Sequence, residues 1–246
     1  MKININSTLS AAFDFYKNNL KKLLTFSAIS VLPLILVQFV LNLALRPGMS
    51  TGFVFLGVLF DFAVLVLIIK CYLATDIFIN GRLNDEALSI GEAFKLTRGR
   101  FWRYVGNAFL LGLIIVVPSF VLVFLNVPYA FSIMMVGFVF VMALYYPLTP
   151  MAALELQYGN LLGRARQMVK GNYARVVALQ LITTSELTIL HNICDTVFAG
   201  KTAALLAVDI VYYCLWFLLV PFAAVVSVLV YRELRGNEET AERTGY

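Results

Sequence analysis

Among the ionisable side chains within or at the edges of the long apolar stretches of this sequence, six stand out for the chemistry they could do. They are Asp61, Lys70, Glu186, His191, Asp195 and Asp209. A charge at the centre of a bilayer costs about 2.5–3.5 kcal/mol on insertion scales, so such side chains usually face a cavity, water or a partner. Their types suit a proton relay, a pH sensor or a polar path through a membrane.

The densest polar pattern lies in the fifth apolar stretch, where one helical face carries Thr184, Thr188, His191 and Asp195. A carboxylate one turn from the only histidine strengthens proton binding by the imidazole, as a relay or sensor requires. A structural interpretation stays open: Asp195 reaches the membrane surface and His191 is hydrogen-bonded between helices. Glu186 is then protonated or paired with Lys70, unless Lys70 extends toward the headgroups.

The same residues predict neither a metal site nor an active site. His191 is alone, and Glu186 lies five positions away on another face. The cysteines Cys71, Cys194 and Cys214 show no paired spacing. Thr188 is the only hydroxyl near His191, and neither an oxyanion motif nor a phosphate-binding glycine loop is present. We expect no enzyme, no metal and no cofactor.

The composition predicts an integral membrane protein. Of the 246 residues, 61% are hydrophobic and only 13% are charged, whereas soluble domains have about 25% charged residues. The net charge is +5, but the cations cluster beside apolar stretches. Anionic lipid is therefore the expected partner, and nucleic acid is not.

Six apolar stretches are long enough to cross a bilayer as helices, at about 23–45, 52–78, 104–126, 129–156, 173–196 and 203–231. Kinks are expected at Pro33, Pro118, Pro221 and within Tyr145–Pro150. The polar N-terminal segment does not fit a signal peptide. We expect one membrane domain over residues 1–236 and a disordered tail over 237–246.

The distribution of lysine and arginine predicts the orientation. All of them except Arg46, Lys70 and Lys201 fall in the N-terminal segment, the second and fourth joints and the tail. Short cytoplasmic loops hold the excess of such residues. Both termini should therefore be cytoplasmic, in a multi-pass protein of the cell inner membrane.

Three segments share the same columns of residues: Ala12–Lys22, Ala93–Arg103 and Ala165–Arg175. Each has an alanine, a cation five positions later, then a turn-former, and a further cation near its end. Each segment predicts a short amphipathic helix in the membrane interface and a turn, at Asn18, Gly99 and Gly171. Ser89 and Glu92 predict a capping box in the second.

The expected fold is therefore an all-α membrane protein of six transmembrane helices in three helix–span–span pseudo-repeats. The units cover about 6–82, 87–159 and 160–236 and should pack with pseudo-threefold symmetry. Coincidence in a biased composition is the alternative. The interfacial residues expected to contact anionic headgroups are Lys17, Lys22, Arg98, Arg100, Trp102, Arg103, Lys170 and Arg175. An ordinary interfacial belt of cations and aromatics explains them equally.

The run from Pro150 to Val176, with Gly159–Asn160, Lys170 and Asn172, resembles the YciC-type family of bacterial inner-membrane proteins. More distantly, the chain is similar to the membrane domain of some glycerophosphodiester phosphodiesterases. The resemblance implies a membrane protein without established chemistry. Those phosphodiesterases catalyse their reaction in a separate soluble barrel, which no stretch of this sequence predicts.

Two functions follow from these observations. The first is a non-catalytic membrane protein that binds or organises lipid, or docks a membrane partner or a second copy of itself. The alternative is a small transporter or channel whose polar path is lined by Asp61, Glu186, His191 and Asp209. Three parallel units lack the opposed half-sites of alternating access, which favours the first function.

Overall fold

The computed structural model describes residues 2–44, 51–125, 130–155, 159–185, 194 and 202–244, and every regular element in these ranges is helical. The elements are α1 (Ile5–Ala44), α2 (Thr51–Leu83), α3 (Ile90–Leu96), α4 (Phe101–Phe124), α5 (Ala130–Leu144), α6 (Leu148–Leu154), α7 (Leu161–Val169), α8 (Tyr173–Gln180), the π-helical segment η1 (Leu181–Ser185) and α10 (Thr202–Thr244).

Five helical segments in the described ranges are long and apolar enough to cross a membrane. They are Ile5–Val37, Phe55–Leu83, Phe101–Val121, Val136–Leu154 and Val208–Glu238. This agrees with a multi-pass membrane protein. The predicted fifth stretch, 173–196, is described continuously only to Ser185, and its apolar helix Tyr173–Thr183 is shorter. The expectation of six spans therefore stays a prediction.

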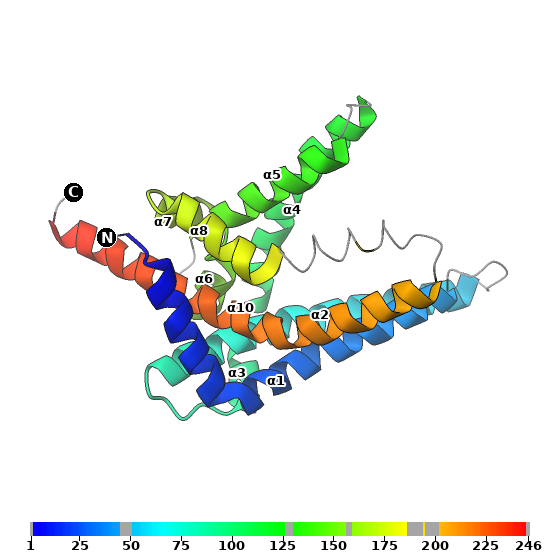
Figure 1. Cartoon of the computed structure of the whole chain (residues 1–246), viewed down its shortest axis with the longest axis horizontal. Coiled ribbons are helices and arrows are strands. Elements are labelled where there is room, and N and C mark those ends of the chain that lie inside the picture. The colour runs from blue at the N-terminus through cyan, green and yellow to red at the C-terminus, as the bar shows by residue number, and fades with distance from the viewer. Residues whose placement is uncertain are drawn as a thin grey trace.

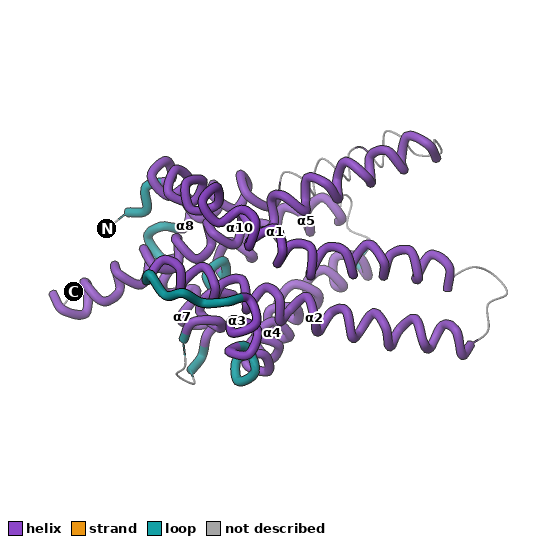
Figure 2. Tube along the Cα trace, turned by 90° about the horizontal axis from the view of Figure 1, so that it is seen from below, coloured by secondary structure: helices purple, strands orange, loops and turns teal. Residues whose placement is uncertain are grey.

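The long helices α1, α2 and α10 lie side by side and form one bundle (Figures 1 and 2). The N-terminal end of α1 and the C-terminal end of α10 lie at the same end of the molecule, which we call the terminal end. Helices α3, α6 and α7 also lie toward this end, whereas α5 leans away from the bundle (Figure 1).

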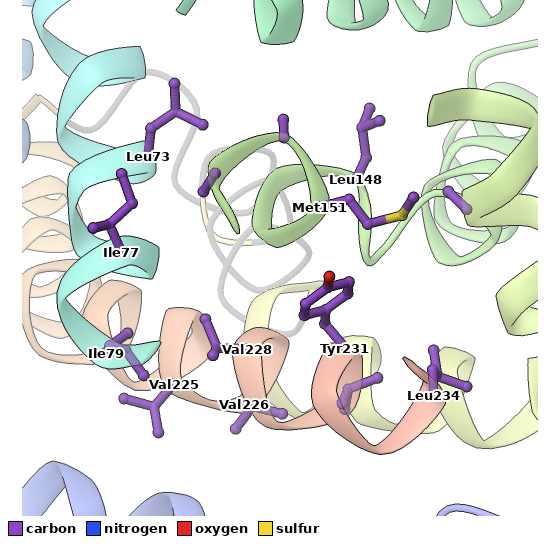
Figure 3. Close-up of a cluster of buried hydrophobic side chains, with 14 of the residues drawn as sticks. Leu73, Ile77, Ile79, Leu148, Met151, Val225, Val226, Val228, Tyr231 and Leu234 are labelled. Atoms are coloured by element: carbon purple, nitrogen blue, oxygen red, sulfur yellow. The ribbon is translucent and has the colours of Figure 1, made fainter. Parts of the chain in front are cut away.

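The core is centred on the short helix α6, which lies between α2 and α10 (Figure 3). Met151 of α6 lies next to Tyr231 of α10, and Leu73 of α2 lies on the other side of α6 (Figure 3). Ala152 and Ala153 follow Met151 and are completely buried. Such small residues are expected where helix backbones approach closely. In contrast, large apolar side chains of α4 are exposed, as expected for a lipid-facing helix; they include Phe109, Val116, Val117, Phe120 and Phe124.

The predicted turns are found at two of the three positions. Gly99 lies in the turn between α3 and α4, and Gly171, with φ of +89°, lies in the turn between α7 and α8. Glycine adopts a positive φ without a steric penalty, which explains the turn at Gly171. Asn18 instead lies inside α1, because asparagine is also compatible with a helix. Helix α1 bends without ending, so that its N-terminal part runs in a different direction from the rest (Figure 1).

Two further expectations concern helix breaks and the C-terminal tail. The break within Tyr145–Pro150 is confirmed, because residues 145–147 form a turn between α5 and α6. The other three prolines lie within helices: Pro33 in α1, Pro118 in α4 and Pro221 in α10. A disordered tail was expected over residues 237–246, and α10 is described as a helix to Thr244. Pairing of Glu238 with Arg164 holds this part of α10 against α7.

Candidate functional site

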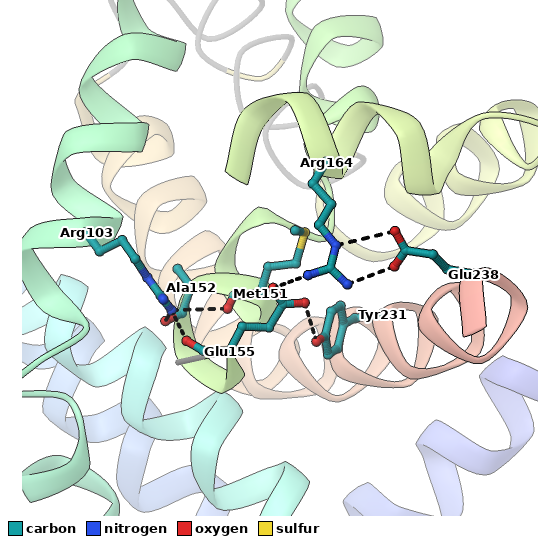
Figure 4. Close-up of polar contacts among 7 residues, drawn as sticks. All are labelled: Arg103, Met151, Ala152, Glu155, Arg164, Tyr231 and Glu238. Carbon is teal, nitrogen blue, oxygen red and sulfur yellow. Dashed lines mark hydrogen bonds and ion pairs between the residues drawn. The ribbon is translucent and has the colours of Figure 1, made fainter. Parts of the chain in front are cut away.

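The C-terminal end of α6 is capped by an arginine from another helix. Arg103 of α4 donates hydrogen bonds from Nη2 to the carbonyl oxygens of Ala152 (2.7 Å), Met151 (3.5 Å) and Glu155 (Figure 4). The last carbonyls of a helix lack partners within the helix and carry partial negative charge, so a guanidinium suits them. Arg103 was expected to contact lipid, and the structure places it against α6.

Glu155 follows α6 and connects it to two further helices. Its side chain is only 8% exposed. The Tyr231 hydroxyl of α10 donates to Oε1 at 2.8 Å, and Arg164 of α7 pairs with Oε2 at 2.6 Å (Figure 4). A buried carboxylate is tolerated when it is paired and hydrogen-bonded in this way. These contacts give both side-chain oxygens of Glu155 a partner.

Arg164 lies between two carboxylates. Besides Glu155 it contacts Glu238 of α10, with 2.8 Å from Nη2 to Oε2 and 3.4 Å from Nε to Oε1. This is the two-pronged geometry that a guanidinium and a carboxylate favour. The hydrogen bonding to Glu238, and then the charges of Glu155 and Glu238, raise the pKa of Arg164 although burial opposes this. The arginine thus joins α6, α7 and α10 as a permanent cation.

The N-terminal segment is tied to the same end of the molecule. The backbone N–H of Ile3 donates to Oδ1 of Asn172 at 2.9 Å, and Asn172 is buried directly after the turn at Gly171. The Thr8 hydroxyl donates to Oε2 of Glu233 in α10 at 3.3 Å. The start of the chain, the α7–α8 turn and α10 therefore form one assembly at the terminal end.

A pocket of about 280 Å³ opens beside this network. It is lined by Asn80, Asn84, Leu154, Tyr231, Arg232, Arg235 and Gly236, which come from the end of α2, from α6 and from α10. Arginine side chains only donate hydrogen bonds, and amide groups add further donors. This lining suits a phosphate or carboxylate group, and the volume suits a headgroup rather than an entire lipid. We call it the arginine pocket.

The other predicted interfacial residues divide into exposed and partly buried side chains. The exposed ones are Lys17, Lys22, Arg98, Trp102 and Lys170, and the partly buried ones are Arg100 and Arg175. Lys22 also has its Nζ 5.8 Å from the centre of the Phe78 ring. Burial, followed by the nearby charge of Arg103, lowers the pKa of Arg100.

The structure does not join the predicted intramembrane residues into one described site. Asp61 is half-buried, and its Oδ1 has no hydrogen-bond partner in the described chain. Lys70 has its Nζ 5.7 Å from the centre of the Phe101 ring, and its expected pairing with Glu186 lies outside the described residues. Asp209 lies near Tyr213. Glu186, His191 and Asp195 lie outside the described residues.

Several residues at the terminal end and in α2 were not predicted from the sequence: Asp76, Glu155, Arg164, Tyr231 and Glu238. A signal existed for Asp76, which is an acidic residue within the predicted span 52–78. Another existed for Glu155, which directly follows the proline-interrupted run that ends in MetAlaAlaLeu. No local pattern indicates that α6 meets α7 and α10.

Comparison with known proteins provides no relative from which a function can be transferred. No family model, no curated protein and no solved structure matches the chain. The resemblance to YciC-type proteins stays a prediction, and the function has to be argued from the geometry of the terminal end.

Proposed function

We propose that this protein is a non-catalytic, multi-pass membrane protein that binds the headgroups of anionic phospholipids at its terminal end. The observation that carries the proposal is the arginine pocket. Its two guanidinium groups, Arg232 and Arg235, lie with the amides of Asn80 and Asn84 around a space of headgroup size. Guanidinium groups bind phosphate with two parallel hydrogen bonds.

The depth of the arginine pocket supports the proposal. Three of the apolar helical segments end beside it, at Leu83, Leu154 and Glu238. An apolar helix that crosses a bilayer ends where the hydrocarbon meets the headgroups. A lipid whose headgroup enters the pocket can therefore leave its acyl chains in the bilayer.

Exposed cations of the three repeated segments support an anionic rather than a zwitterionic lipid. Exposed Lys17, Arg98 and Lys170 lie on α1 and on the turns that follow α3 and α7. Each cation near an anionic leaflet contributes about 1 kcal/mol of attraction. The excess of such residues at this end also supports a cytoplasmic location for it and for both termini.

The pseudo-repeat is part of the same proposal. Its three alanines, Ala12, Ala93 and Ala165, are all 0% exposed, whereas the three cations five positions later are exposed. In each of the three segments, a small residue therefore packs against the core and a cation lies at the surface. Three similar interfacial segments then face one leaflet.

The transporter alternative has one observation in its favour. Asp61 lies in the apolar segment Phe55–Leu83 with an unpartnered Oδ1 among the described atoms, as a residue on a polar path requires. Replacing Asp61 and Asp209 by asparagine in the full chain distinguishes the two functions. Lipid binding should be unchanged, whereas a transporter should lose uptake in liposomes.

Lipid binding is tested with the full chain in nanodiscs that contain phosphatidylglycerol or phosphatidylcholine. Native mass spectrometry then counts the lipids that stay bound after release from the disc. We expect retention of phosphatidylglycerol in the wild type and about a thirtyfold loss in Arg232→Gln/Arg235→Gln, because the two guanidinium–phosphate contacts each contribute about 1 kcal/mol.

Arg166→Gln is the matched control, because Arg166 is an exposed arginine of α7 that does not line the pocket. It should retain phosphatidylglycerol as the wild type does. Equal retention of both lipids by the wild type, or undiminished retention by the double variant, would contradict the proposal.

A further inference from the structure

Asp76 is an acidic residue buried in the apolar part of α2. Its side chain is only 3% exposed, and it lies within the candidate span Phe55–Leu83. Its Oδ2 accepts no hydrogen bond from the described residues, and none of their cations forms an ion pair with it. A bare carboxylate in such a place is too costly to persist, so something has to neutralise it.

The groups of other elements that interact electrostatically with Asp76 are tyrosine hydroxyls. The Tyr104 side chain of α4 and the Tyr146 side chain of the α5–α6 turn lie within electrostatic reach of the carboxyl. Tyr104 lies beside Thr149 of α6. The Tyr146 hydroxyl is buried and has no partner among the described atoms. It lies beside Thr183, whose own hydroxyl donates to the Leu179 carbonyl at 2.8 Å.

The charged groups on the elements packed against α2 are engaged elsewhere. Lys70 lies over the Phe101 ring. Arg82 of α2 and Lys22 of α1 both lie over the Phe78 ring. Arg103 of α4 caps α6. Glu155, after α6, binds Tyr231 of α10. Lys95 of α3 is exposed. Arg232 of α10, one of the two arginines of the pocket, is also exposed.

We propose that Asp76, together with Tyr104 and Tyr146, forms a proton-binding site inside the membrane part of the protein. A proton neutralises the carboxyl and turns it into a hydrogen-bond donor as well as an acceptor. The two tyrosine hydroxyls give the neutral group a polar surrounding. Loss of the proton places a negative charge at the contact of α2 with α4 and α6 and weakens that contact. The site does not depend on lipid binding at the arginine pocket.

The proposal is tested by infrared spectroscopy on the full chain in lipid nanodiscs. The wild type should show the carbonyl stretching band of a protonated carboxylic acid at neutral pH. Asp76→Asn should lose part of this band, and Asp76→Glu should shift it rather than delete it. Asp14→Asn is the control, since Asp14 is exposed on α1, and its spectrum should match the wild type. An unchanged band in Asp76→Asn would overturn the proposal.

A titration of the wild type keeps the test valid even if Asp76→Asn fails to fold. The band should disappear reversibly as the pH is raised well above neutral, equally in sodium chloride and in choline chloride. A band that is absent at every pH overturns the proposal. A band that is lost in sodium chloride alone also overturns it, because the occupant is then a metal cation rather than a proton.

Discussion

Glu155 and Asp76 are two buried carboxyl groups in opposite situations. Glu155 is 9% exposed and Asp76 is 3% exposed, so burial hardly separates them. Glu155 binds the Tyr231 hydroxyl and the Arg164 guanidinium, whereas Oδ2 of Asp76 has no partner in the described chain. The difference is their place along the helices. Glu155 follows α6 at the terminal end, and Asp76 lies inside an apolar segment.

This contrast shows what position does to a charge in a membrane protein. Near the headgroups, long arginine side chains reach a carboxylate and keep their own polar atoms satisfied. Within the apolar part, an arginine that paired with the carboxylate would itself have to be buried, at a further desolvation cost. A bound proton neutralises the carboxyl without burying a second charged side chain. A charged network therefore joins α6, α7 and α10, while α2 carries a carboxyl that we propose to be neutral.

Removing Glu155 should have the largest effect on stability. Glu155→Ala leaves the Tyr231 hydroxyl unpaired and Arg164 with Glu238 alone. Because Arg164 is 36% exposed, we expect a loss of about 2 kcal/mol in the free energy of unfolding, below the value for a fully buried pair. Unfolding by dodecyl sulfate in mixed micelles measures it. Asp14→Ala is the control, and equal stability of the two variants would contradict the role of Glu155.

Removing the cap of α6 should have the next largest effect. Arg103→Ala deprives the carbonyls of Met151, Ala152 and Glu155 of a charged donor, which should cost about 1.5 kcal/mol in the free energy of unfolding. Arg103→Lys keeps the charge and should lose less. The same micelle titration measures both variants. Equal loss in both would show that the planar guanidinium, not the charge, is what α6 requires.

The hydroxyl of Tyr231 should contribute about 1.5 kcal/mol to the free energy of unfolding, the lower end of the range for a hydrogen bond to a charged group. Tyr231→Phe keeps the ring in the core between α6 and α10 and removes only the bond to Glu155. Combining it with Glu155→Ala should cost little more than Glu155→Ala alone. Additive losses in this double-mutant cycle would mean that the two groups act independently.

Neutral amides sharpen the comparison of the two carboxyl groups. Glu155→Gln removes a charge that Arg164 uses and should lower the free energy of unfolding by about 1 kcal/mol. Asp76→Asn resembles a protonated carboxyl and should change it by less than about 0.5 kcal/mol. Micelle titrations at neutral pH compare them. If Asp76→Asn is the more destabilising of the two, Asp76 is charged in the folded protein.

The exposed carboxyl group of Glu92 should show the smallest effect, and only at acidic pH. Hydrogen bonds from the Ser89 hydroxyl and backbone N–H lower the pKa of Glu92 in the capping box of α3. A lowered pKa in the folded state means that this contribution is present above the ordinary pKa of 4.5 and is lost as the pH falls through the lowered value. Amide hydrogen exchange at the start of α3 should therefore speed up in acid beyond the intrinsic pH dependence. Ser89→Ala removes the hydroxyl and keeps the backbone N–H, so it should reduce this extra change.

Local features of the fold could be predicted from the sequence because their causes lie within a few residues. Runs of apolar residues identify the helices that can cross a membrane. They do not indicate that α10 continues to Thr244. Ser89 and Glu92 form the predicted capping box, and Gly171 forms the predicted turn. The turn predicted at Asn18 failed, since no steric requirement excludes asparagine from the helix that continues there.

The candidate site was decided by the tertiary structure. Tyr231 is 76 positions from Glu155, Glu238 is 74 from Arg164, and the carbonyl of Glu155 is 52 from Arg103. Hydrophobic periodicity and capping patterns act over a few residues and contain no information on which distant helix ends meet. Only the packing of α6 between α2 and α10 brings these groups together. The same packing buries Asp76 among tyrosines, because an acidic residue in an apolar helix acquires its neighbours from other helices.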